Sequence, residues 1–208
     1  MKFVLFVEGH TESKAIPAFL KRWLDGKLSQ KVGIDPVRFE GWSEMIRDLP
    51  DKTCRHLRSP GASEIIAVIA LLDLYGPTFY PAERTSAEDR LEWATKDLQK
   101  KVNQTRFRVF FAVHEVEAWL LSKPDLFPSP IRQVLPNKIQ HPESVNFDEP
   151  PAKLLQRLYV NRLGRNYRKV TDGSQLFGKL SPDDVYAKCP NFRDMMDQML
   201  ELARAAGL

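Results

Sequence analysis

The sequence predicts an α/β fold in which a mainly parallel sheet of about four strands carries helices on both faces. Two segments, Phe3–Val7 and Ile65–Leu72, are apolar at every position. Because successive side chains of a strand point to opposite faces, such a segment is typical of a strand buried on both sides. The intervening segments have apolar residues at helical spacing. Strands that alternate with helices indicate parallel pairing.

The first part of this alternation begins with the strand Phe3–Val7, after which Gly9 permits a tight turn. Apolar residues at helical spacing then predict a helix over Ser13–Leu24. Pro17 lies inside this helix, so we expect the helix to start later or to be kinked. Lys31–Phe39 is predicted to form the second strand.

The next elements complete the predicted sheet. A helix is expected over Ser43–Leu57, with an interruption at Pro50. The remaining predicted elements are a strand over Glu64–Leu74, a helix over Ser86–Lys101, a strand over Arg106–Val113 and a helix that opens at Glu115–Leu121.

The character of the chain changes after Ser122. Prolines crowd the segment up to Pro151, and few periodic apolar stretches interrupt them. We therefore expect an α/β core over residues 1–122 and an irregular, partly helical C-terminal extension over residues 123–208 that packs on the core. Two helices are predicted in this extension, over Ala152–Leu163 and Asn191–Ala206.

Composition bounds the function only loosely. The formal net charge of +4 is mildly basic and falls short of a polybasic nucleic-acid binder. Cys54 and Cys189 are far apart and form no zinc-ligand spacing, which favours a reducing compartment over a disulfide. The apolar runs are too short to span a bilayer or to act as a signal peptide. The sequence thus predicts a cytoplasmic protein without a membrane partner.

Acidic residues follow three of the predicted strands. Glu8 ends the first strand, Asp73 lies near the end of the third, and His114, Glu115 and Glu117 follow the last. In a parallel α/β sheet, ligands bind beyond the carboxyl ends of the strands. Carboxylates gathered there repel one another and normally need a cation, and hard oxygen ligands suit Mg²⁺ or Mn²⁺. The sequence therefore predicts a divalent-metal site at this edge.

Each carboxylate also has a simpler interpretation. Glu8 can cap the positive end of the first helix, and Asp73 can be an ordinary turn residue. At least one of Glu115 and Glu117 can face solvent, because residues two apart on a helix point apart. These alternatives stay open at the level of sequence.

Basic and histidine side chains supply candidate phosphate contacts. His10 and His114 follow strand ends, where they can bind phosphate or form local hydrogen bonds. Aromatic side chains among cations suit single-stranded nucleic acid, although a solvated helix end accounts for such a group equally well. The candidate patch consists of Tyr159, Arg162, Arg165, Tyr167, Arg168 and Lys169.

These motifs resemble a known group of proteins. "FVEGHTE" and the later "LLDLYG" resemble the Toprim arrangement, in which a strand-end glutamate and an aspartate motif hold catalytic Mg²⁺. More closely, "DLYGPTFYP", "VHEVEAWLLSKPDLF", "PPAKLL" and "YRK" resemble the bacterial domain-of-unknown-function 4276 family, whose members are similar to Toprim nucleases. The resemblance extends from residue 3 to about residue 192.

The resemblance implies roles for particular positions. Glu8 matches the Toprim glutamate assigned to acid/base work or metal binding, and Asp73 matches the first aspartate of the Toprim DxD motif. Glu117 resembles the acidic residue after the later strand, with Glu115 as its neighbour. Lys153 and Lys169 resemble basic positions of the extension. The expected substrate contacts are Gly9, His10, Lys153, Arg168 and Lys169.

One position departs from the Toprim pattern. The second aspartate of DxD is replaced by Tyr75, so the usual carboxylate pair lacks a member. Either Glu115 or Glu117 then supplies the lost ligand, or the metal site is weakened. This departure bears on catalysis more than on fold.

The resemblance implies a Toprim-like metal-dependent nuclease of a bacterial defence context. Glu8, Asp73 and Glu117 would hold Mg²⁺ or Mn²⁺, and Lys153 or Lys169 would offset charge on the phosphate. The expected partners are nucleic acid, DNA or RNA, and an ATPase subunit, since some relatives are encoded near ATPases. The rival hypothesis is a catalytically lapsed subunit that binds nucleic acid or a protein partner. Phosphoryl transfer on a small nucleotide fits the same site.

Overall fold

The structure is a computed structural model that describes residues 1–135, 139–144 and 149–208. Part of the predicted proline-rich segment, including Pro136, lies outside the described residues. The strands are β1 (Lys2–Val7), β2 (Gly33–Arg38), β3 (Ile65–Asp73) and β4 (Phe107–Ala112). The α-helices are α1 (His10–Asp25), α2 (Trp42–Leu57), α3 (Ala87–Val102), α4 (Glu117–Leu120), α5 (Ser129–Arg132), α6 (Pro151–Leu163), α7 (Ser174–Lys179), α8 (Pro182–Lys188) and α9 (Pro190–Ala205).

The strands form one parallel sheet in the order β2-β1-β3-β4. This confirms the predicted α/β fold class and the predicted parallel pairing. The connection from β1 leads outward to β2, whereas β3 and β4 lie on the other side of β1. The order of the strands therefore reverses between β1 and β3, and this is the switch point at which such sheets bind ligands.

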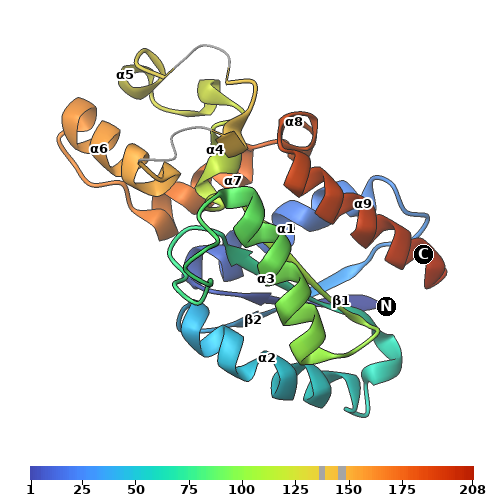
Figure 1. Cartoon of the computed structure of the whole chain (residues 1–208). Coiled ribbons are helices and arrows are strands. Elements are labelled where there is room, and N and C mark those ends of the chain that lie inside the picture. Colours follow the sequence, from blue (N-terminus) through green and yellow to red (C-terminus); the bar gives the residue numbers. More distant parts are fainter. Residues whose placement is uncertain (136–138, 145–148) are drawn as a thin grey trace.

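Helices cover both faces of the sheet (Figure 1). On one face, Val4, Phe6 and Val68 pack in a cluster with residues of α2 and α3. On the other face, Phe3 and Leu5 share a larger cluster with α1, α7 and α9. The extension therefore contributes helices to the same hydrophobic core as the first strand.

The predicted elements recur with shifted ends, and the expected later start of the first helix and the expected interruption at Pro50 are wrong. Pro17 lies inside the continuous helix α1 and Pro50 inside the continuous helix α2. An internal proline removes a backbone hydrogen bond and costs about 3 kcal/mol. Tertiary packing outweighs this cost, because α1 buries Phe19, Leu20 and neighbouring residues against the sheet.

The extension is more helical than the sequence indicated. The two predicted helices correspond to α6 and α9, but α7 and α8 were not predicted. Both are short, with only Leu176, Phe177, Pro182 and Val185 buried, so they leave little periodic signal. A π-helical turn, η4 (Lys169–Gly173), precedes α7, and 3-10 turns η2 (Pro124–Leu126) and η3 (Pro142–Ser144) lie in the proline-rich part.

The helices of the extension lie in two separate parts of the molecule. Helices α5 and α6 contact each other and lie together at one end of the molecule, whereas α9 runs back toward the amino terminus (Figure 1). The turn η4 contacts α1 and α7. None of the helices in the described part of the chain has the length and apolar character to cross a membrane.

Candidate functional site

Two carboxylates meet at the switch point of the sheet. Glu8 follows β1, and Asp73 is the last residue of β3. The two strands are adjacent, with Val7 opposite Leu71. Glu8 Oε1 accepts a hydrogen bond of 2.8 Å from the backbone N–H of Asp73. Glu8 thus binds the neighbouring strand, and the N-cap residue of α1 is Gly9, without a side-chain cap.

Asp73 in turn connects the sheet to the segment that follows β4. Its Oδ1 accepts a hydrogen bond of 3.0 Å from the backbone N–H of Val116. Val116 lies between Glu115 and Glu117, so this contact holds both glutamates against the end of β3. Asp73 is therefore more than a local turn residue.

Both glutamates after β4 are buried, at 8% exposure for Glu115 and 0% for Glu117. The simpler interpretation, in which one of them faces solvent, is wrong. Glu115 Oε2 accepts a hydrogen bond of 2.8 Å from the backbone N–H of Ala152 at the start of α6. Neither carboxylate oxygen of Glu117 has a hydrogen-bond partner among the described residues. A buried carboxylate that accepts no hydrogen bond is expensive, which makes Glu117 a candidate ligand for a cation.

Lys169 is brought to these carboxylates from the extension. It lies at the start of η4, and its Nζ is 3.3 Å from Glu117 Oε1 and 3.9 Å from Glu115 Oε1. The side chain is 44% exposed. The ammonium group thus contacts the cluster while part of the side chain reaches solvent.

Burial and mutual repulsion raise the pKa values of the carboxylates. Burial first, and then the charge of Glu12, raise the pKa of Glu8 to about 7, although the hydrogen bond from Asp73 opposes the shift. Burial likewise raises the pKa of Glu117 to about 7 against the opposing charge of Lys169. Burial and the charges of Glu8, Glu12 and Glu117 raise the pKa of Asp73 well above its ordinary value. The cluster therefore carries more negative charge than its surroundings compensate.

The pKa of Lys169 shows the same imbalance from the cationic side. Burial lowers this pKa, but the charges of Glu117, Asp73 and Glu115 outweigh burial and raise it. Lys169 is therefore fully protonated at neutral pH, yet one ammonium group faces several carboxylates.

Glu12 also belongs to this cluster, although it was not among the predicted site residues. A Cβ atom on Gly9 would lie 2.6 Å from Glu12 Oε2, so the Glu12 side chain folds back over Gly9. Gly9 is the N-cap of α1, and Glu12 is in the first turn. An acidic residue three positions after an N-cap commonly folds back in this way, and this spacing is the signal that could have found it.

The prediction that the aromatic side chains of the candidate patch contact nucleic acid is wrong. Tyr159 and Tyr167 are 2% and 7% exposed and pack edge to face, so neither ring can stack on a base. Arg165 pairs with Asp172 at 2.8 Å. Both tyrosine rings therefore belong to the hydrophobic core. The Tyr167 hydroxyl is buried without a hydrogen-bond partner in the described residues, and burial, with the charge of Glu117, raises its pKa.

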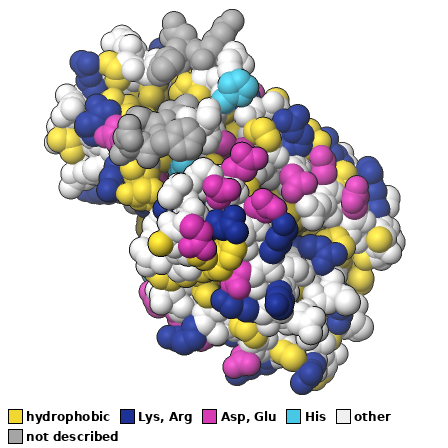
Figure 2. All heavy atoms as spheres, viewed as in Figure 1, with side chains coloured by type: hydrophobic (Ala, Val, Ile, Leu, Met, Phe, Trp, Pro, Cys, Tyr) yellow, Lys and Arg dark blue, Asp and Glu magenta, His cyan; other side chains and the backbone are white. Residues whose placement is uncertain are grey.

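The other predicted contacts lie around the cluster. His10 is exposed as the first residue of α1. Arg168 is exposed just before η4. Lys153, in the first turn of α6, donates to the Tyr75 hydroxyl at 3.4 Å. His114 is buried, and burial lowers its pKa. Lys and Arg are interspersed with Asp and Glu on the face seen in Figure 2, without a continuous basic band.

The carboxylates of Glu8, Asp73 and Glu117 are of the chemical type that binds a hard divalent cation. Carboxylate oxygens are the ligands that Mg²⁺ and Mn²⁺ prefer, and the raised pKa values of Glu8, Asp73 and Glu117 show negative charge that a cation would neutralise. The described His, Cys, Asp and Glu side chains nevertheless contain no group of three already positioned to hold a metal ion. Ligand side chains would have to adjust to close around one.

Comparisons with known proteins found similar solved structures. The chain is similar to the C-terminal region of the Burkholderia pseudomallei OLD protein, with 20% identity, a TM-score of 0.47 and coverage of 99% of this chain and 98% of that one. It is also similar to the C-terminal region of the Xanthomonas campestris pv. campestris OLD protein, with 20% identity, a TM-score of 0.45 and coverage of 98% and 94%. No curated protein matches the sequence.

One family model matches most of the chain. The model of the family described as "Domain of unknown function (DUF4276)" matches residues 7–200, a span that contains the carboxylate cluster, Tyr75, Lys153 and Lys169. The chain therefore belongs to the DUF4276 family.

Proposed function

We propose that this protein is a Mg²⁺- or Mn²⁺-dependent hydrolase of nucleic-acid phosphodiester bonds. The observation that carries the proposal is the gathering of Glu8, Asp73 and Glu117 at the switch point between β1 and β3, with Lys169 facing them. The Toprim resemblance of "FVEGHTE" and "LLDLYG" supports the same reading.

Glu8, Asp73 and Glu117 are the residues that would hold the metal. A bound divalent cation polarises a phosphate oxygen and lowers the pKa of a water molecule. In hydrolysis the water oxygen bonds to phosphorus, the ester P–O bond breaks, and the leaving oxygen takes up a proton. The resemblance assigns Glu8 either to metal binding or to acid/base work, and in the second role its carboxylate would accept the proton of the attacking water.

Lys169 is placed to stabilise the phosphate. Its ammonium group lies 3.3 Å from Glu117 and its side chain is partly exposed, so it can contact an anion that enters from solvent. Lys169→Met should reduce the cleavage rate by about 10²-fold, the usual effect of removing one donor to developing negative charge. Lys179→Met, on the exposed side of α7, is the matched control.

The test is metal-dependent cleavage by the purified protein. Plasmid DNA, single-stranded DNA and tRNA should be cut with Mg²⁺ or Mn²⁺ and remain intact with EDTA. Glu8→Gln and Asp73→Asn should lower the rate by at least about 10³-fold, because each removes a ligand charge. Glu201→Gln, an exposed carboxylate of α9, should cleave at the wild-type rate. Cleavage that survives Asp73→Asn in a folded protein contradicts the proposal.

A second candidate is a catalytically lapsed subunit that binds nucleic acid or a protein partner. It is favoured by Tyr75 in place of the second DxD aspartate, and by the lack of three described side chains already arranged to hold a metal. This candidate predicts nucleic-acid binding without cleavage under either metal. Binding should then be unchanged by Glu8→Gln.

The proposed setting is bacterial defence together with an ATPase. This follows from the resemblance to relatives encoded near ATPases. Cleavage should therefore be measured with and without an ATPase encoded next to the gene, and loss of phage protection in Asp73→Asn cells would link the site to the phenotype. Unchanged protection by this variant would contradict the defence role.

A further inference from the structure

We propose that the cavity beside Tyr75 binds one unpaired nucleobase, which stacks on the Tyr75 ring. The substrate of the neighbouring carboxylate site is then a single-stranded segment of nucleic acid. This inference rests on the proposed phosphodiester hydrolysis, which it deepens by naming the form of the substrate.

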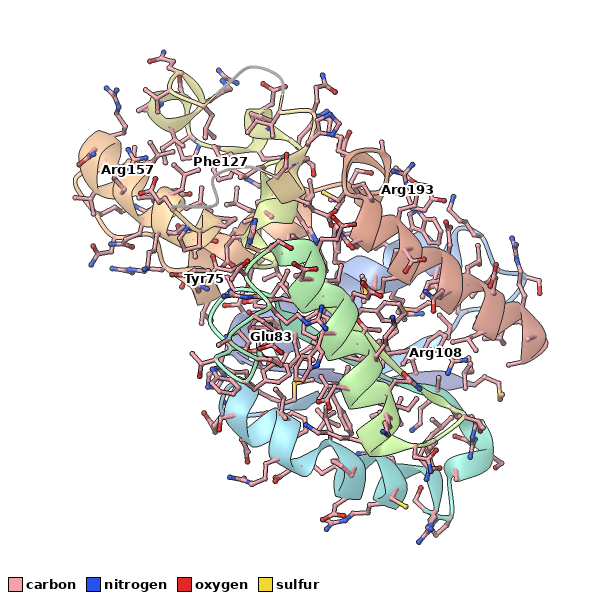
Figure 3. The ribbon with its side chains drawn as sticks, viewed as in Figure 1. Tyr75, Glu83, Arg108, Phe127, Arg157 and Arg193 are labelled. Carbon is pink, nitrogen blue, oxygen red and sulfur yellow. The ribbon has the colours of Figure 1, made fainter. Side chains whose placement is uncertain are left out.

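Tyr75 is an aromatic side chain that the fold leaves in solvent. It is 39% exposed, although two residues earlier Asp73 forms part of the carboxylate cluster. Its backbone N–H donates to the carbonyl of His114 at 2.8 Å, which fixes its position at the end of β3. Figure 3 shows Tyr75 where the end of the sheet meets the extension. The position that usually holds a ligand carboxylate thus presents an aromatic face.

A cavity of about 400 Å³ opens next to this ring. Its lining includes Tyr75, Gly76, Pro77, Tyr80 and Arg90. The volume lies within the range of small-molecule sites and can hold one nucleotide. The lining combines aromatic rings with a guanidinium group, which suits a flat ring attached to an anionic backbone.

The walls of the cavity are fixed by the local sequence. Gly76 has a φ of +107°, a backbone conformation that side chains disfavour, and Pro77 is buried. The Tyr80 hydroxyl donates to the carbonyl of Leu74 at 3.0 Å. Arg90 lies over the Tyr80 ring at 5.2 Å, and its Nε donates to the carbonyl of Arg84. A site held in this way needs little ordering when a ligand enters.

The cavity adjoins the carboxylate cluster. Tyr75 lines the cavity, and Asp73, two residues earlier on β3, accepts a hydrogen bond within the cluster. Tyr80 also lines the cavity, and its hydroxyl donates to the carbonyl of Leu74, the residue after Asp73. A base in the cavity would bring the backbone of its strand to the end of β3, where Glu8 contacts Asp73.

Two cations near Tyr75 can contact the phosphate backbone of the same strand. Lys153 Nζ lies 5.7 Å from the centre of the Tyr75 ring, and Arg90 lines the cavity. Aromatic faces with neighbouring cations bind single strands, because every base has a face that can stack. A base inside a duplex is already stacked and paired, and extruding it costs a few kcal/mol. The arrangement therefore favours an unpaired base.

The test uses single-stranded and duplex oligonucleotides that contain 2-aminopurine, whose fluorescence falls when it stacks. Binding is measured with wild-type protein in EDTA and with Asp73→Asn in Mg²⁺, so that cleavage does not interfere. The single strand should be quenched and the duplex should not. Tyr75→Ala should weaken binding by about 5- to 150-fold, the equivalent of 1–3 kcal/mol for one stacked base. Tyr75→Phe should bind like wild type.

Val160→Ala, an exposed apolar truncation on α6, is the matched control and should leave binding unchanged. If Tyr75→Ala binds the single strand as tightly as wild type, or if the duplex binds equally well, the base site is wrong even if Mg²⁺-dependent cleavage is seen. If quenching depends on Tyr75 but no substrate is cut with either metal, the base site stands and the proposed hydrolysis fails.

Discussion

Two buried glutamates in this molecule have opposite environments. Glu143, in η3, is 8% exposed and accepts hydrogen bonds from the start of α9. The donors are the backbone N–H and side-chain amide of Asn191, each at 3.0 Å, and the backbone N–H of Phe192 at 3.2 Å. Glu117 is more deeply buried, and no hydrogen bond to either of its oxygens comes from a described residue.

The difference separates a carboxylate satisfied by hydrogen bonds from one whose contact among the described residues is a single ionic partner. Glu143 satisfies backbone groups that every helix N-terminus leaves unpaired, and the helix dipole favours its charge. Burial raises the pKa of Glu143, while its hydrogen bonds with Asn191 and Phe192 oppose the shift. Glu117 has Lys169 as its counter-charge and a pKa of about 7. Its environment is unfavourable for the folded protein alone, which is typical of functional sites.

The largest expected effect on stability is at Glu143. Glu143→Ala should lower the free energy of unfolding by about 3 kcal/mol, because buried donors at the start of α9 lose their acceptor. Urea denaturation followed by circular dichroism measures this change. The remaining folded protein should retain its metal-dependent cleavage rate. A loss of cleavage without a loss of stability would assign Glu143 to the site and remove the distinction from Glu117.

Replacing Glu117 should instead flatten the pH dependence of stability. Because its pKa is raised from about 4.5 to about 7, the folded state binds more protons than the unfolded state between these values. Wild-type stability should therefore fall as pH rises through this window, by about 2–3 kcal/mol from this group. Glu117→Gln cannot titrate and should lack this part of the fall.

The measurement is urea denaturation at about pH 5 and about pH 8 for wild type and Glu117→Gln. Glu201→Gln, at an exposed carboxylate of α9, serves as the control. If the free energy of unfolding of Glu117→Gln changes with pH as much as that of wild type, the prediction that Glu117 has a raised pKa is contradicted.

The smallest effect concerns metal binding. At ten times its Kd, Mn²⁺ should stabilise the protein by about 1.4 kcal/mol, a rise in Tm of about 3–6 °C. The rise should be largest above about pH 7, where Glu8 and Glu117 are ionised, and should shrink toward about pH 5 as protons compete with the metal. Thermal denaturation checks this. Asp73→Asn should abolish the rise and Glu143→Gln should retain it; a rise unaffected by Asp73→Asn places the metal elsewhere.

Much of the fold could be predicted from local pattern. Phe3–Val7 and Ile65–Leu72 are apolar throughout, and they form the central strands β1 and β3. Glu8 and Asp73 end these strands, so parallel pairing alone brings them to one edge. Short elements with few buried residues, such as α7 and α8, could not be predicted because they carry almost no periodicity.

The sequence by itself thus determined the parallel sheet and the carboxylates at its carboxyl edge, because strand period and strand end are local properties. Tertiary structure alone decided that Lys169 reaches Glu117 from the extension and that Tyr159 and Tyr167 are core. It also decided that Glu117 is buried without a hydrogen-bond partner in the described chain, whereas Glu143 is satisfied by α9. Such outcomes depend on which distant segments pack together, and no local spacing records that.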